Sequence, residues 1–350
     1  MTDRPATGPT VAVARPEVGG GAAGTSFGLP VDTGSGIPAA PSPLRIGPAM
    51  FAWGGRTHVM GILNVTPDSF SGDGLLAGSA AVAARSAGTA SPAGAADPVA
   101  AAVSIGQRMV EEGADLLDIG GESSRPGHAD VPADEEIERV VPVIRALRVA
   151  LPDTPLSIDT TKPAVVEAAI AAGADLVNDV WGVAPDDAVL RLAAAHGNPI
   201  VLMHNRAQAR YTNLVVEVLA DLERAIERAL AAGISWDAII VDPGFGFGKT
   251  PAHNLVLLRE LAILRTLGRP VLLGTSRKST LGKVLDLPAD QRLEATLATT
   301  ALGIAAGIDI VRVHDVRANV RTARMTDAVV RDRPARVAHT DPPTAEGVPT

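Results

Sequence analysis

Residues 239–250 read Ile-Ile-Val-Asp-Pro-Gly-Phe-Gly-Phe-Gly-Lys-Thr. The β-branched run that opens this stretch is typical of a strand buried on both faces of a parallel sheet. The run ends at Asp242, so this carboxylate is expected at the edge of the sheet, where a ligand can reach it. The three glycines at alternate positions would let the following backbone approach that ligand closely. The closing Gly-Lys-Thr is similar to the end of a phosphate-binding P-loop, but that motif requires a glycine where Pro243 stands, so we exclude it.

The composition limits the class of protein. The chain has 350 residues, of which 46% are apolar and 3% aromatic, so Ala, Val, Leu and Ile must fill its core. A net charge of −8 argues against a nucleic-acid-binding protein. The lack of cysteine fits a reducing cytoplasm, and no apolar run approaches the roughly 18 residues of a membrane-spanning helix. The N-terminus also lacks the order of a secretory signal, so we predict a cytoplasmic protein that binds neither nucleic acid nor membranes.

The chain divides into a central domain and two tails. Residues 1–45 and 331–350 are rich in small and polar residues without a period, and we predict that both are disordered. Residues 46–330 form the predicted domain. Within it, residues 78–98 are rich in Ala, Ser and Gly, and we predict that they form a mobile insertion.

Eight short apolar runs alternate with helical stretches across this domain. This alternation predicts a single-domain α/β fold, a closed (β/α)₈ TIM barrel, with a doubly wound open sheet as the alternative. The predicted strands are His58–Thr66, Leu116–Glu122, Leu156–Thr161, Leu176–Gly182, Pro199–His204, Ile239–Gly244, Pro270–Ser276 and Ile308–Asp315.

All eight predicted strands end in polar residues, which predicts one composite site at the carboxyl-terminal rim of the barrel. Two of these residues are the carboxylates Asp159 and Asp242, with the amide of Asn178 between them in the chain. Carboxylates facing adjacent ring N–H and amino groups would fix a planar, donor-rich heterocycle by charge-assisted hydrogen bonds. For Asp159 a helix N-cap is an open alternative, because the following Thr-Thr-Lys-Pro can start a helix.

A second group of strand-end residues is basic and suits phosphate oxygens. It consists of Arg125, Lys278, Arg312 and His314, and the alternation along the last strand places Arg312 and His314 on one face. An ion pair of Arg312 with Asp309 or Asp315 is the alternative. Zinc is disfavoured because close His or Cys ligands are lacking, whereas Asn64 could give one oxygen to a Mg²⁺ on a diphosphate. Acids holding a heterocycle beside bases holding an anion fit the displacement of pyrophosphate.

Several longer motifs resemble the dihydropteroate synthases, folate-pathway transferases of the pterin-binding (β/α)₈ family. The resemblance covers about residues 56–325. The motifs are Met-Gly-Ile-Leu-Asn-Val-Thr-Pro-Asp-Ser-Phe-Ser (60–71), Asp-Ile-Gly-Gly-Glu-Ser-Ser-Arg-Pro-Gly (118–127), Ser-Ile-Asp-Thr (157–160), Asn-Asp (178–179), Asp-Pro-Gly-Phe-Gly-Phe-Gly-Lys (242–249), Ser-Arg-Lys-Ser (276–279) and Arg-Val-His-Asp (312–315).

The resemblance implies condensation of 7,8-dihydropterin-6-ylmethyl diphosphate with 4-aminobenzoate, giving 7,8-dihydropteroate and pyrophosphate by an S_N1-like loss of diphosphate. It implies a Mg²⁺ cofactor, a homodimer and inhibition by sulfonamides. The implied catalytic residues are Asp242, Lys278, Arg312, His314 and Arg125. The implied pterin-binding residues are Asp159, Asn178, Met203, Asp242 and Lys278; those for 4-aminobenzoate are Ser124, Arg125, Pro126, Phe247, Lys278 and Ser276; those for diphosphate are Asn64, Arg125, Arg312 and His314, with Asn64 also a metal ligand.

Some positions depart from the family pattern. The order around Asp73 is altered, Ser124 stands where Thr is usual, and Thr280 stands where a bulkier residue is common. Two rival functions share the barrel and the pterin acids. A folate-dependent methyltransferase acting on a corrinoid would leave the anion-binding residues unexplained, and a pterin-binding paralogue without turnover is the other rival.

Overall fold

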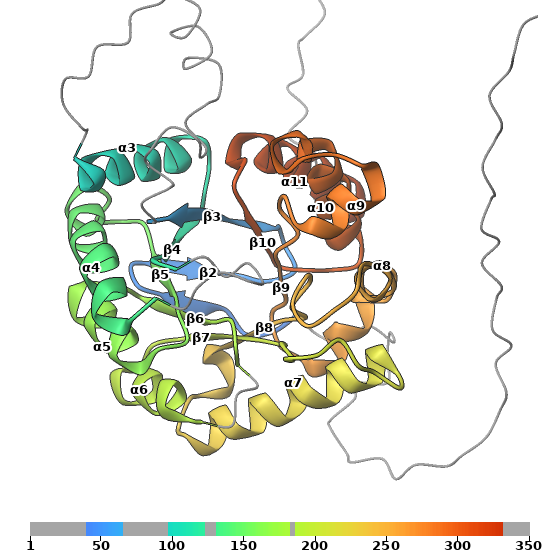
Figure 1. The fold of residues 1–350 in the computed structure, drawn as a ribbon, viewed down its shortest axis with the longest axis horizontal. Coiled ribbons are helices and arrows are strands. Elements are labelled where there is room, and N and C mark those ends of the chain that lie inside the picture. Colours follow the sequence, from blue (N-terminus) through green and yellow to red (C-terminus); the bar gives the residue numbers. More distant parts are fainter. Residues whose placement is uncertain (1–39, 66–96, 123–130, 183–185, 332–350) are drawn as a thin grey trace, which may run out of the picture. The chain divides into compact units, whose positions relative to one another are not determined.

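The computed structural model describes residues 40–65, 97–122, 131–182 and 186–331, which all belong to one compact unit (Figure 1). Eight parallel strands form one sheet in the order β8-β7-β6-β5-β4-β3-β10-β9. They are β3 (His58–Asn64), β4 (Leu116–Gly120), β5 (Leu156–Asp159), β6 (Leu176–Asp179), β7 (Ile200–Met203), β8 (Ile239–Asp242), β9 (Leu272–Leu273) and β10 (Ile310–Val313).

The two outer strands of this order meet and close the sheet. Val241 of β8 forms a parallel bridge with Val271, just before β9, and its amide donates to the Pro270 carbonyl at 3.0 Å. The prediction of a closed (β/α)₈ barrel is therefore confirmed, and the open-sheet alternative is wrong. Most strands are shorter than predicted at their carboxyl ends because the polar residues there belong to loops, which is what frees their side chains for a site.

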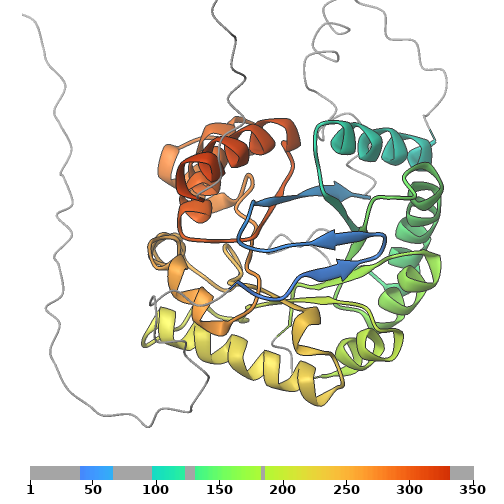
Figure 2. The same ribbon diagram turned by 180° about the vertical axis from the view of Figure 1, so that it is seen from behind.

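Helices surround the sheet on its outside (Figures 1 and 2). The α-helices of the described residues are α3 (Pro98–Glu111), α4 (Ala133–Ala150), α5 (Pro163–Ala172), α6 (Ala188–His196), α7 (Leu214–Ala231), α8 (Pro251–Arg259), α9 (Ser279–Leu285), α10 (Leu293–Ala305) and α11 (Val316–Val330). Short 3₁₀ segments lie at Trp236–Ala238, Leu261–Leu267 and Ala289–Gln291. In the described part of the chain no helix is long and apolar enough to cross a membrane.

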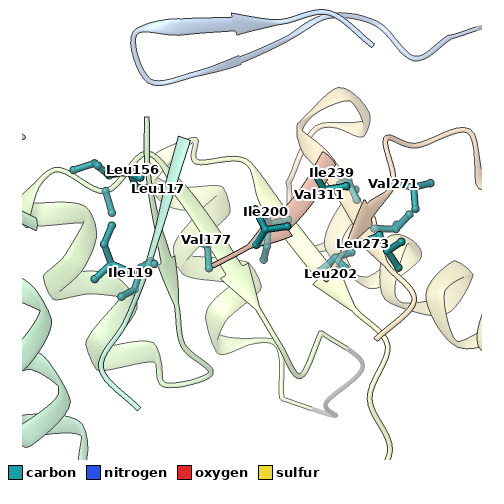
Figure 3. Close-up of a cluster of buried hydrophobic side chains, with 14 of the residues drawn as sticks. Leu117, Ile119, Leu156, Val177, Ile200, Leu202, Ile239, Val271, Leu273 and Val311 are labelled. Atoms are coloured by element: carbon teal, nitrogen blue, oxygen red, sulfur yellow. The ribbon is translucent and has the colours of Figure 1, made fainter. Parts of the chain in front are cut away.

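The apolar core has two parts. The larger one fills the space between the strands and the surrounding helices, and Figure 3 shows some of its strand side chains, such as Leu117, Val177 and Leu202. It is built almost wholly from Val, Leu, Ile and Ala, as the low aromatic content requires. Removing these side chains from water stabilises the barrel by about 25 cal/mol per Å² of apolar surface.

The smaller part of the core closes the amino-terminal end of the barrel with a hairpin that the sequence did not predict. Strands β1 (Leu44–Ile46) and β2 (Ala49–Phe51) pair antiparallel across this end (Figure 2). Leu44, Ile46, Phe51 and Trp53 are buried against one side chain from each of seven barrel strands: Met60, Leu116, Leu176, Val201, Ile240, Leu272 and Ile310. The barrel unit thus begins before residue 46, inside the range assigned to the first tail.

Candidate active site

The register of the sheet brings the predicted strand-end residues to one level of the rim. Gly120 pairs with Asn64 on one side and with Asp159 on the other, and Asp159 pairs in turn with Asn178. Met203 pairs with Asp242 further round the barrel. Residues that lie far apart in the sequence therefore converge at the carboxyl ends of adjacent parallel strands, as predicted.

A buried charge cluster lies at the centre of this rim. The Arg312 guanidinium donates through Nε to Asp118 Oδ2 and through Nη2 to Asp159 Oδ2, each at 2.5 Å. Asn178 Nδ2 donates to the same Asp118 oxygen at 3.0 Å. Burial raises the pKa of Asp159 to about 7, even though Arg312 opposes the shift. The guanidinium thus joins β10 to β4 and β5, and the Asn178 amide joins β6 to the same cluster.

Two alternatives left open by the sequence are settled by these contacts. Helix α5 has Lys162 at its N-cap position, with no side-chain cap, so Asp159 is not a helix cap. Arg312 pairs with neither Asp309 nor Asp315, because Asp309 accepts from backbone amides and Asp315 pairs with Arg277. Asp159 and Arg312 instead form a hydrogen-bonded ion pair with each other at the end of the barrel.

Asp118 is a member of this cluster that the sequence analysis did not single out. It lies in the middle of β4 rather than at its end, and it is fully buried. Its Oδ1 has no hydrogen-bond partner among the described residues. A carboxylate interrupting the apolar run Leu-Leu-Asp-Ile was the signal that could have identified it, since a buried charge requires a partner.

The buried Asp242 and the half-buried Lys278 form a second group of interacting charges at the rim. Asp242 Oδ1 accepts from the Gly244 amide at 2.7 Å. Burial raises the pKa of Asp242, and the nearby Lys278 ammonium opposes the rise. Burial likewise lowers the pKa of Lys278 to about 8, with Asp242 opposing. Each group therefore favours the charged form of the other, against the effect of burial.

The glycine loop after β8 approaches the Lys278 side chain closely, whereas its predicted approach to a ligand stays a prediction. Lys278 Nζ donates to the Phe245 carbonyl and lies 4.3 Å from the centre of the Phe247 ring. A Cβ on Gly246 would come within 2.9 Å of the Lys278 side chain, and the φ of Gly246 is +88°, so this position requires glycine. The ammonium of Lys278 and an aromatic face thus lie side by side.

Ser276 and His314 are also brought together. The Ser276 hydroxyl lies 2.9 Å from His314 Nδ1 and accepts from the His314 amide at 3.2 Å. Between Ser276 and Lys278, Arg277 has a φ of +58°, which is rare for a residue with a side chain. Its guanidinium makes two hydrogen bonds to the Asp315 carboxylate, at 3.0 and 2.5 Å, and so connects the loop after β9 to the end of β10.

The loop after β4 begins beside a group of ion pairs that the sequence analysis also missed. Lys162 Nζ donates to Glu122 and, at 2.7 Å, to the buried Glu136 of α4. Arg139, also on α4, donates to the Gly121 carbonyl at 2.7 Å. The backbone at the end of β4 is therefore fixed by side chains of the helix that follows the loop.

Several predicted residues lie outside the described part of the chain. They are Asp73 and Ser124, Arg125 and Pro126, and nearly all of the predicted insertion at 78–98. Their assigned roles stay predictions. For metal binding, Asn64 ends β3 at the rim, and the described residues contain no group of three or more His, Asp or Glu side chains that could hold an ion.

Comparison with known proteins agrees with this geometry. Residues 90–314 match the family described as pterin binding enzyme. A dihydropteroate synthase from Clostridium beijerinckii is 46% identical over 289 residues, covering 82% of this chain and 100% of the relative. The chain belongs to the dihydropteroate synthase family of pterin-binding enzymes.

Solved structures of dihydropteroate synthases share the fold. The Clostridium difficile enzyme, determined in the presence of pteroic acid, has a TM-score of 0.72 and 44% identity, covering 81% of this chain and 100% of the other. The Xanthomonas albilineans enzyme with 4-aminobenzoic acid has a TM-score of 0.74 and 41% identity, covering 84% and 100%. The family resemblance drawn from the sequence motifs is thus confirmed.

Proposed function

We propose that this protein is a transferase, a dihydropteroate synthase that joins 7,8-dihydropterin-6-ylmethyl diphosphate to 4-aminobenzoate in folate biosynthesis. The observation that carries this conclusion is the convergence of Asp159, Asn178, Asp242, Lys278 and Arg312 on one strand-end site within the family fold. One relative was solved in the presence of pteroic acid, which joins a pterin to 4-aminobenzoate as the expected product does, and another with 4-aminobenzoic acid, the expected second substrate.

The pterin is assigned to the acidic side of the rim. Asp242 and Asn178 offer a carboxylate and an amide to the ring N–H, amino and carbonyl groups, and Asp159 lies next to Asn178 in register. The charge of Lys278 acts on Asp242. Met203, which is buried, pairs in register with Asp242, and its thioether would give the ring an apolar contact. Charge-assisted hydrogen bonds in this nearly dry site would fix the orientation of the ring.

The diphosphate and 4-aminobenzoate are assigned to the basic side. Arg125, Arg312 and His314 would bind the diphosphate together with Asn64. Ser124, Arg125, Pro126, Phe247, Ser276 and Lys278 would surround 4-aminobenzoate. Support comes from the Lys278 ammonium over the Phe247 ring and from the Ser276 contact with His314, which place cationic and apolar groups next to each other.

The bond changes follow from this division. The bond between the pterin methylene carbon and the diphosphate oxygen breaks first, and its electron pair leaves with the diphosphate. The Asp242 carboxylate then faces a pterin cation, which it stabilises because the surroundings are buried and preorganised. The amine nitrogen of 4-aminobenzoate attacks the methylene carbon, forms the C–N bond and loses a proton.

We propose that a Mg²⁺ ion arrives with the diphosphate. Asn64 would supply one protein oxygen, and substrate oxygens and water the rest, which is a usual arrangement for this ion. When bound, Mg²⁺ would neutralise charge on the leaving diphosphate.

We also propose a cytoplasmic homodimer. The paired helices α10 and α11 expose Leu302, Met325 and Val329, which are 59%, 66% and 71% accessible. Clustered apolar side chains on a helical face are typical of an interaction surface. Light scattering is expected to give twice the mass of the chain.

A coupled assay of pyrophosphate release tests the proposed reaction. We expect release from the pterin diphosphate that depends on 4-aminobenzoate, and competition between sulfonamides and 4-aminobenzoate. A methyltransferase acting on a corrinoid would release no pyrophosphate, and a paralogue without turnover would bind the pterin but form no product. Either result with pure protein would overturn the proposal.

A further inference from the structure

Lys249 follows the glycine loop, and all three of its donors have acceptors. Its ammonium lies 2.8 Å from His204 Nδ1 and 3.0 Å from each of the carbonyl oxygens of Gly244 and Phe247. An ammonium has three donors, so these three acceptors satisfy it. Two of the three belong to the loop that carries Phe247.

The contact with Lys249 fixes the state of His204. Burial lowers the pKa of Lys249 to about 7, with the charge of Asp242 opposing the shift, so the ammonium form prevails below that pH. In that form the group only donates, so His204 Nδ1 accepts and the ring proton is on Nε2, which donates to Asp221 Oδ2 at 3.0 Å. Burial lowers the pKa of this fully buried histidine to about 3, and the charge on Lys249 lowers it further. Asp221 also accepts from Arg206 at 2.8 Å. A neutral histidine therefore connects Lys249 to the ion pair between the buried Asp221 of α7 and Arg206 of the loop after β7.

The backbone carbonyls of the glycine loop accept hydrogen bonds from two ammonium groups, those of Lys249 and Lys278. The carbonyls of Gly244 and Phe247 face Lys249, whereas the carbonyl of Phe245 faces Lys278. The amides are also used: Gly246 donates to Asn254 Oδ1 at 2.8 Å, and Phe247 donates to the Gly244 carbonyl at 3.1 Å. The position of the Phe247 ring over Lys278 thus depends on which way these carbonyls point.

A close approach to β7 completes the arrangement. A Cβ on Gly244 would lie 1.8 Å from the His204 carbonyl oxygen, and one on Gly248 would lie 2.3 Å from that of Arg206. The loop can therefore lie against the end of β7 only with glycine at both positions. That contact is what puts Lys249 within reach of His204.

We propose that Lys249 is a positioning residue for the second substrate: its ammonium, held by neutral His204, fixes the carbonyls of the glycine loop so that Phe247 and Lys278 form the 4-aminobenzoate site. This inference rests on the proposed function for the identity of that substrate. The positioning of the loop itself does not depend on turnover, so it is measured separately.

The first test compares Lys249→Met with Lys283→Met, which removes an exposed lysine of α9. By hydrogen–deuterium exchange, peptides containing 244–249 are expected to exchange about 10-fold faster in Lys249→Met, because hydrogen bonds to a charged donor are lost. The KM for 4-aminobenzoate is expected to rise by about the same factor, with kcat and pterin affinity within about 2-fold of the parent. Lys283→Met is expected to match the parent.

The second test separates the two bonds of His204. His204→Asn keeps an acceptor near the Nδ1 position and so retains a partner for Lys249, whereas His204→Gln places its polar group near Asp221 instead. We expect His204→Asn to retain a KM for 4-aminobenzoate closer to the parent value than His204→Gln does. A merely structural role of the histidine would not produce this order.

Parent-like exchange of the loop in Lys249→Met would overturn the inference, whether or not the parent turns over. Faster exchange with an unchanged KM, in a parent that makes product, would show that the loop does not serve 4-aminobenzoate and would also overturn it. A parent that makes no product would overturn the proposed function, while the exchange result would still decide whether Lys249 positions the loop.

Discussion

Replacing Arg312 by methionine should destabilise the folded barrel strongly. The change keeps much of the apolar stem but removes the guanidinium that pairs with Asp118 and Asp159, each 2.5 Å away. Both carboxylates are nearly or fully buried, so they would be left as uncompensated charges. Breaking a buried ion pair by removing one partner costs about 3–5 kcal/mol, and we expect a loss of free energy of unfolding in that range.

The loss should grow with pH. The pKa of Asp159 is raised from 3.8 to about 7 in the folded protein, so its contribution to stability is favourable at low pH and is lost as the pH rises through about 7. Removing Arg312 raises this pKa further, and each added unit costs ~1.4 kcal/mol above it. Equilibrium urea unfolding, followed by tryptophan fluorescence, should therefore show a larger deficit at about pH 8 than at about pH 5.

A matched control is Arg317→Met, which removes an exposed guanidinium of α11 paired with Glu112 at 3.4 Å. Surface pairs contribute about 0–1 kcal/mol, so this variant should remain close to the parent at both pH values. An Arg312→Met deficit of less than about 1 kcal/mol, or one that does not change with pH, would refute the interpretation of the cluster as a charge-compensated unit.

Three further predictions concern other parts of the molecule. Asp242→Asn should weaken pterin binding by about 10-fold or more in calorimetry, because a charge-assisted hydrogen bond is lost, and unchanged affinity would contradict its assignment. Arg277→Gly should retain about 1 kcal/mol more stability in urea than Arg277→Ala, because the φ of +58° favours glycine while both variants lose the pair with Asp315; equal stabilities would remove the argument for backbone strain. Phe51→Ala should cost about 3–5 kcal/mol in the same assay without changing KM for either substrate, and a smaller loss would mean that the hairpin is not part of the core.

The sequence predicted those features that depend on local patterns. The alternation of apolar runs and helical stretches predicted the barrel, and the abrupt end of the run at Asp242 placed that carboxylate at the rim. These predictions succeed because a strand that is buried along its length must present its first polar residue where the sheet ends.

The individual side-chain contacts between distant residues were not predicted. The partners of Arg312 lie 194 and 153 positions away, so its nearest carboxylates in the chain were the wrong candidates. Asp118 gave no strand-end signal because it lies within β4. The hairpin strands have only three residues each in a Gly- and Pro-rich stretch, and their burial depends on strands that follow much later in the chain.

The hairpin at the amino-terminal end of the barrel also bears on how the chain is made. Leu44 and Phe51 leave the ribosome among the first of the described residues, but the surface they cover includes Ile310, which is translated some 260 residues later. At synthesis rates of about 5–20 residues per second, on the order of 10 seconds or more pass between synthesis of the hairpin and synthesis of the last strand that packs against it. The nascent chain therefore exposes the apolar face of the hairpin until the final strand emerges. Such a surface is one that chaperones acting during translation would be expected to bind.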